Sequence, residues 1–140
     1  MNSDTYRAAI ETHRFYDTIS ISIVGGMITL SGATIYLLDK IEHRLDKMGT
    51  IIVSVAVLLL LLRIYRFSAY YANVARNVAA KIEGDETNIG ISTVLKKVRT
   101  DNNFAEYRAD KKWYRGIYGS VHFLCIALVI GFITLAVRIC

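Results

Sequence analysis

The chain has 140 residues, of which 54% are hydrophobic, and it carries a formal charge of +5 at pH 7. This apolar share exceeds that of an ordinary soluble domain, and the absence of proline disfavours a fold of short strands and tight turns. The apolar residues are concentrated in three blocks, 18–38, 48–62 and 117–137, and the first and third contain no Asp, Glu, Lys or Arg. The composition therefore excludes an ordinary soluble domain and predicts a helical membrane protein.

The first block, 18–38, is long enough to span a bilayer, because about 20 apolar residues cross a hydrocarbon core of roughly 30 Å. Residues 1–17 carry three acids and no compact basic segment, so we expect this block to remain as a helix rather than to be a cleaved signal peptide.

Small and weakly polar residues recur along this first span at alternating steps of four and three, as in a coiled-coil seam. We call these six positions the seam: Thr18, Ser22, Gly25, Thr29, Gly32 and Tyr36. Two interpretations stay open, because the seam could pack against another helix or line a water-filled pore built from several copies of the chain. Both interpretations predict that the seam avoids lipid.

The second block ends at Arg63, but Arg63 and Arg66 can extend to the lipid headgroups, so we expect a span over 48–64. The following sequence, RIYRFSAYYANVARNVAAKIE, continues without a helix breaker to Gly84. Its apolar residues lie on one helical stripe: Phe67, Tyr71, Val74, Val78 and Ile82. The second span is therefore predicted to run on as an amphipathic stalk that Gly84 caps.

A short helix is expected over 92–99, after which Thr100 or Asp101 caps a longer helix that runs from Asn103 into the third span, 117–137. The predicted fold class is an all-α integral membrane protein with three transmembrane helices. We expect the stalk extensions of the second and third spans to form a cytoplasmic helical hairpin. Residues 1–140 then form a single membrane domain, in which 1–17 and 65–116 make a small cytoplasmic helical bundle.

Lys and Arg are unequally divided between the two sides of the predicted membrane. With three spans, residues 1–17 and 63–116 share one side, which holds 13 of the 17 Lys and Arg residues. The positive-inside rule therefore places the N-terminus and residues 65–116 in the cytoplasm and the C-terminus outside. We expect the membrane to be a bacterial inner membrane.

The segment 63–115 holds eleven bases against six acids. Nine of these bases are candidate contacts for anionic lipid headgroups or for an anionic ligand such as a nucleotide: Arg63, Arg66, Lys96, Lys97, Arg99, Arg108, Lys111, Lys112 and Arg115. Aromatic residues near the ends of the spans fit an interfacial belt, with a base-stacking or ligand-binding surface as the alternative. Reading of duplex nucleic acid is not expected, because the sequence has no motif for it.

Motifs for catalysis are missing. His13, His43 and His122 are far apart and are divided between the two sides of the predicted membrane, while Cys125 and Cys140 have no disulfide or metal spacing. We therefore expect a protein that is not an enzyme and has no catalytic residue, metal or cofactor. The lack of a carboxylate inside the spans also disfavours a small ion-coupled transporter.

The order of elements over Met1 to Glu83 is a short cytoplasmic helix, a tight two-span hairpin and the long stalk RIYRFSAYYANVARNVAAKIE. This architecture loosely resembles the small SLATT-type membrane effectors of bacterial conflict systems. The resemblance implies a homo-oligomeric pore or membrane-perturbing effector in antiviral defence, triggered when a nucleotide signal or a protein partner engages the cytoplasmic part. The alternative is a non-conducting adaptor subunit whose stalks dock a cytoplasmic partner.

Overall fold

The computed structural model describes residues 3–84, 89–108 and 111–139, and the side chains of 3–84, 89–108 and 119–138. Within these ranges the elements are α1 (Ser3–Lys40), α2 (Arg44–Glu83), α3 (Ile91–Lys97), the 3-10 helix η1 (Asn102–Tyr107) and α4 (Lys111–Ile139), with no strand. α1, α2 and the Gly119–Arg138 part of α4 are each long and apolar enough to cross a membrane. The predicted all-α fold with three such helices is therefore confirmed.

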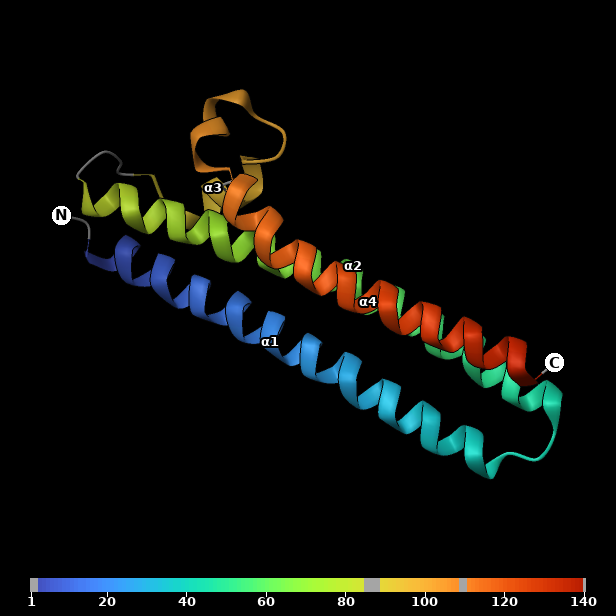
Figure 1. Cartoon of the computed structure of the whole chain (residues 1–140). Helices are drawn as coiled ribbons and strands as arrows, with labels where there is room; N and C mark the ends of the chain where they lie inside the picture. The colour runs from blue at the N-terminus through green and yellow to red at the C-terminus, as the bar shows by residue number, and fades with distance from the viewer. Residues whose placement is uncertain (1–2, 85–88, 109–110, 140) are drawn as a thin grey trace.

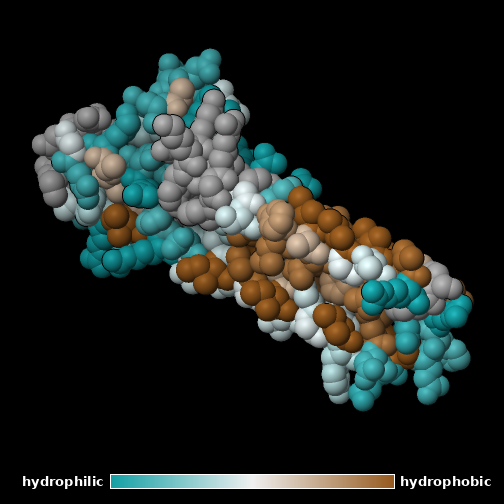
Figure 2. Space-filling model, in the orientation of Figure 1, coloured by the Kyte–Doolittle hydropathy of each residue, from teal (hydrophilic) through white to brown (hydrophobic). Residues whose placement is uncertain are grey.

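α1 and α2 form a long antiparallel hairpin, and α4 packs along α2 while making little contact with α1 (Figure 1). The N-terminus and the α3–η1 segment lie at one end of the molecule, and the α1–α2 turn and the C-terminus lie at the other. On the face drawn in Figure 2, an apolar band separates two hydrophilic ends. This is the surface pattern that a bilayer imposes on a spanning protein.

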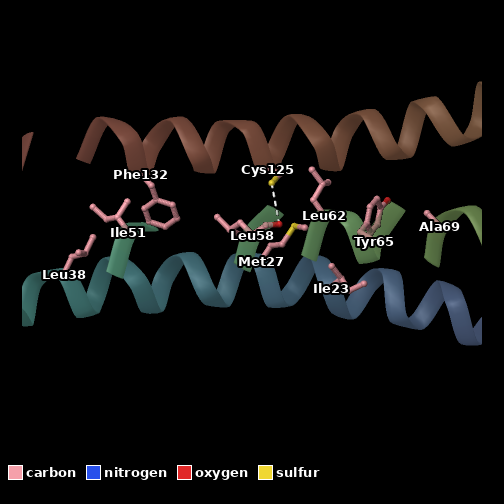
Figure 3. Packing of buried hydrophobic residues seen from close by; sticks show 10 residues of the cluster. All are labelled: Ile23, Met27, Leu38, Ile51, Leu58, Leu62, Tyr65, Ala69, Cys125 and Phe132. Carbon is pink, nitrogen blue, oxygen red and sulfur yellow. Dashed lines mark hydrogen bonds between the residues drawn. The ribbon is translucent and has the colours of Figure 1, made fainter. Parts of the chain in front are cut away.

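The core of the apolar band is filled by side chains from all three long helices. Met27 of α1 lies beside Leu58 and Leu62 of α2, and Phe132 of α4 lies beside Ile51 of α2 (Figure 3). Met27 and Leu58 are fully buried. One chain therefore encloses a packed apolar interior rather than an aqueous path.

The end of the molecule that holds the α3–η1 segment has a second core, centred on the last turns of α2. Its buried residues come from α1, α2, η1 and α3 with the turn that follows it: Ala9, Val74, Val78, Ala79, Ile82, Val94, Val98, Phe104 and Tyr107. α2 has 40 residues, which corresponds to about 60 Å at 1.5 Å per residue and is about twice the hydrocarbon thickness. The stalk predicted after the second span is thus present, and α2 ends at Glu83 with Gly84 as its C-cap, as expected.

The prediction of one continuous helix from Asn103 into the third span is wrong. Instead of one helix from Asn103 into the third span, the chain forms η1, with Asp101 accepting a hydrogen bond from the Asn103 backbone N–H at 2.9 Å, and α4 begins only at Lys111. Burial of Phe104 and Tyr107 in the second core accompanies this short element. The stalk beside that of α2 belongs instead to α1, a single helix of 38 residues in which residues 3–17 continue directly into the first span.

Candidate functional site

The seam lies on the opposite side of α1 from the face that packs against α2. The buried positions of α1 are Ala9, Ser20, Ile23, Met27, Ser31, Thr34 and Leu38. From Ser20 onward each lies two residues from a seam position, and two residues correspond to about 200° of rotation around an α-helix. α1 thus carries small polar residues on two opposite faces. The seam is one face, and the other, which includes Ser20, Ser31 and Thr34, is buried inside the chain.

Hydrogen bonding separates these two faces of α1. The buried hydroxyls of Ser20, Ser31 and Thr34 each donate to the backbone carbonyl four residues earlier, at 2.8–2.9 Å. Thr34 also lies 2.8 Å from the hydroxyl oxygen of Ser54 on α2. These contacts satisfy polar groups that would otherwise be exposed to an apolar environment.

All six seam residues are exposed, and the side chain of Tyr36 is 66% exposed. Within the described part of the chain, Ser22 and Thr29 make no side-chain hydrogen bond. A methyl group built onto Gly25 or Gly32 would meet nothing within 4 Å, so packing inside one chain does not require glycine at either position. A row of exposed hydroxyls and unfilled glycines is the type of surface that lets a second helix approach closely in lipid.

A cavity of about 620 Å³ lies where α2 leaves the apolar band. It is lined by Arg63, Arg66, Phe67, Tyr70, Arg99 and Arg108. The first four residues lie on the first turns of α2 after its uncharged run, whereas Arg99 follows α3 and Arg108 follows η1. Three segments that are distant in the sequence therefore bring four guanidinium groups to one place.

Arg99 is held against the aromatic rings of α2. Its guanidinium carbon lies 5.0 Å from the ring centroid of Phe67, 4.8 Å from that of Tyr70 and 5.3 Å from that of Tyr71. Such cation–π contacts are strongest where water is partly excluded. Arg108 is fixed differently, because its Nε donates a hydrogen bond to the backbone carbonyl of Val98 at 3.0 Å.

Burial raises the pKa of the Tyr70 hydroxyl, and the positive charges of Arg99 and Arg108 oppose that rise without overcoming it. Tyr70 therefore remains a neutral hydroxyl at physiological pH. It adds a hydrogen-bonding group beside the arginines and the Phe67 ring that line the same cavity.

The nine predicted basic residues separate into three groups. Arg63, Arg66, Arg99 and Arg108 line the cavity. Lys96 and Lys97 are exposed on α3 outside it, with the Lys97 ammonium 5.9 Å from the ring centroid of Phe104. The side chains of the remaining three lie outside the described ones: Lys111, Lys112 and Arg115.

Sequence reasoning missed the way in which Arg99 joins α2. Aromatic residues near the ends of the spans, including Phe67, Tyr70 and Tyr71, fit an interfacial belt or a ligand-binding surface, and the spacing of these three over one turn places them on one side of the helix. The ring of Tyr71 also stacks on Tyr16 of α1, with 5.7 Å between the centroids and 29° between the ring planes. The aromatic residues therefore connect the cavity to α1, as well as lying near the end of the apolar band.

No family model, curated protein or solved structure matches this chain. Among the residues that the structure describes, no three His, Cys, Asp or Glu side chains come together in a group that could hold a metal ion. The resemblance to SLATT-type effectors stays a prediction. The seam and the arginine-lined cavity are therefore the two candidate sites of this protein.

Proposed function

We propose that this protein assembles in a membrane through the seam of α1 into a homo-oligomer that forms a pore or otherwise perturbs the bilayer. The observation that carries the proposal is that α1 packs against α2 with one face and leaves the opposite face, which bears Ser22 and Thr29, exposed. In a lone chain these hydroxyls would meet lipid tails. Contact with a second copy or with water in a pore gives them hydrogen-bond partners.

The glycines favour the same surface. Gly25 and Gly32 are seven residues apart, about two helical turns, and neither is needed for packing inside the chain. Glycine at such positions allows two helix backbones to approach each other. Because the interior of one chain is filled by Met27, Leu58 and their neighbours, an aqueous path would have to form between copies, with the seam facing its axis.

The proposal assigns control of the assembly to the basic end of the molecule, which the positive-inside rule places in the cytoplasm of a bacterial cell. Tyr16, which stacks on Tyr71, lies two residues before Thr18, the first seam position. A ligand or partner that binds one arrangement of this end more tightly than another would shift the population of the assembly. The resemblance to SLATT-type effectors is the basis for placing this activity in antiviral defence.

Flux through liposomes tests the pore directly. Purified protein is reconstituted, and leakage of ions and small dyes is compared for the natural chain, for Ser22→Leu on the seam and for Ala56→Leu as the control. Ala56 is an exposed small residue of the second span, so the control adds a leucine to the apolar band without touching the seam. We expect leakage from the natural chain and from Ala56→Leu, and a loss of at least about tenfold in Ser22→Leu.

Two other results would reject the pore. If Ser22→Leu conducts as well as Ala56→Leu, the seam does not line or assemble the path. If well-folded oligomers of the natural chain conduct nothing with any candidate ligand, the alternative of a non-conducting adaptor subunit replaces the pore, and the seam then serves only to pack helices.

A further inference from the structure

The cavity beside the first turns of the α2 stalk brings four arginine side chains together. Within the described residues, Arg63, Arg99 and Arg108 form no ion pair with a carboxylate. Like charges held together at the edge of a low-dielectric region repel one another more strongly than they would in bulk water. An arrangement of this kind is stabilised when an anion enters it.

The groups in the cavity match one chemical class of anion. A guanidinium group presents a planar fork of N–H donors that pairs with two oxygens of a phosphate, and arginine is preferred over lysine where such paired contacts are made. Among the residues whose side chains the structure describes, the four bases that line the cavity are all arginines, and the lysines of the neighbouring α3 lie outside it.

Two of the four arginines are positioned before any ligand arrives. Arg99 is stacked over three aromatic rings, and Arg108 is tied to the Val98 carbonyl. A positioned donor loses less conformational freedom when it binds, so preorganisation raises affinity. These contacts distinguish the cavity from a surface of mobile, solvated bases.

The size and the wall of the cavity indicate that the phosphate carries an organic group. A space of about 620 Å³ lies within the range of small-molecule sites and is larger than a bare inorganic anion needs. The ring of Phe67, 47% exposed, offers an apolar face beside the arginines. A glycerol or acyl segment could pack there, and so could the flat face of a base.

We propose that this cavity binds the phosphate group of an organic phosphate ester. Two sources share that chemistry: the headgroup of an anionic phospholipid, which reaches this depth because Arg63 follows the apolar run directly, and a soluble nucleotide. The inference gives a ligand class to the basic end that controls the proposed assembly, and it rests on that proposal only for the placement of this end in the cytoplasm. Binding is measured without flux, so each proposal can fail alone.

The test uses the full-length protein in nanodiscs, with one arm for each source. In the lipid arm, native mass spectrometry measures retention of phosphatidylglycerol from mixed phosphatidylglycerol and phosphatidylcholine discs. In the soluble arm, calorimetry measures ATP binding in discs of phosphatidylcholine alone. Each arm compares the natural chain with Arg99→Gln, Arg99→Lys and the matched control Lys96→Gln, which removes a charge from the same segment outside the cavity.

We expect at least one arm to show binding that both Arg99 variants weaken by about tenfold, equivalent to about 1.4 kcal/mol. Arg99→Lys keeps the positive charge and loses the planar fork of donors. Weaker binding by this variant would therefore show that the geometry of the donors matters. Lys96→Gln should change the affinity by less than about twofold. The arm that shows this pattern identifies the source.

Two results would overturn the proposal. One is equal weakening by Lys96→Gln and Arg99→Gln, which would mean that net charge alone attracts the anion. The other is the absence of Arg99-dependent binding in both arms, with circular dichroism and gel filtration showing that all variants are folded. Binding without flux in the liposome experiment would leave this inference standing and remove only the pore.

Discussion

The hydroxyl oxygens of Thr34 and Ser54 lie 2.8 Å apart in the buried interface between α1 and α2. Each hydroxyl also lies 2.8 Å from a carbonyl oxygen of its own helix, that of Leu30 for Thr34 and that of Thr50 for Ser54. Two hydroxyl protons thus serve three contacts, because each hydroxyl donates only once. One proton bridges the helices while the other bonds within its own helix.

A double-mutant cycle on this pair measures the bridge. We expect Thr34→Val and Ser54→Ala to destabilise the folded chain, with a coupling free energy of about 0.6 kcal/mol between them, the average for interhelical hydrogen bonds in membranes. Thr34→Val keeps the branched shape, so lost packing contributes little. The free energy of unfolding in bicelles supplies the four values of the cycle. Strict additivity would show that each hydroxyl bonds only to its own helix.

The sequence identified the seam as a face for close helix contacts, but it did not indicate which face of α1 packs against α2. Ser22 and Thr29 of the seam have the same side-chain chemistry as Ser31 and Thr34 on the buried face of α1, and each pair is spaced so that its two members share one helical face. Helical spacing defines a face but does not say which neighbour covers it, so only the structure could assign α2 to the face that holds Ser31 and Thr34.

Among the elements, α2 carries most of the fold, because it belongs to both cores. Its apolar half packs against α1 and α4, and its last turns pack against α1, α3 and η1. Polar contacts join η1 to this distal half, since Lys81 lies 2.9 Å from Glu106 and the Asn77 amide donates to the Arg108 carbonyl at 2.7 Å. The Lys81–Glu106 pair is partly exposed and therefore stabilises the contact only modestly.

The two cores have no side chain in common and are connected through α1 and α2. A mutation that destabilises one core should therefore leave the other folded. We expect Ile82→Ala to cost about 2–5 kcal/mol, since Ile82 is 2% exposed and its truncation leaves a cavity in the second core. Hydrogen exchange should quicken in α3, η1 and the distal turns of α2, while the amides of 51–62 stay protected. The control is Arg76→Ala, an exposed truncation in the same stretch, which should change neither region. Loss of protection along all of α2 would contradict two separable cores.

The spans and the stalk of α2 could be predicted from the sequence, but the 3-10 helix could not. The spans could be predicted because hydrocarbon thickness fixes the length of an uncharged helix. The buried stripe of Val74, Val78 and Ile82 followed from helical periodicity. The 3-10 helix could not be predicted in the same way, because no glycine or proline marks the break after η1, and tertiary burial of Phe104 and Tyr107 accompanies the short element.

In the whole molecule, the cavity lies near the Thr18 end of the seam, while the Tyr36 end of the seam lies toward the α1–α2 turn. The arginine-lined cavity adjoins the end of the apolar band, and the stacked rings of Tyr71 and Tyr16 connect its wall to the helix that carries the seam. The sequence predicted the bases and the seam separately. Their connection depends on the docking of the α3–η1 segment against α2, which residue spacing alone does not reveal.

Disulfide cross-linking in native membranes shows whether copies of the chain meet along the seam. In a background of Cys125→Ala and Cys140→Ala, single cysteines replace Ser22 or Thr29 on the seam, and Ile21 or Ile28 beside it. All four positions are exposed in the single chain, and Ile21 and Ile28 are 68% and 59% exposed. The monomer alone therefore predicts no difference between the two pairs.

Copies inserted in one orientation present parallel helices to each other, so the same seam position on two chains comes within disulfide reach. We expect cross-linked dimers for Ser22→Cys and Thr29→Cys, seven residues apart, and little cross-linking for Ile21→Cys and Ile28→Cys. Equal cross-linking at all four positions, or cross-linking only at the isoleucine positions, would contradict assembly through the seam.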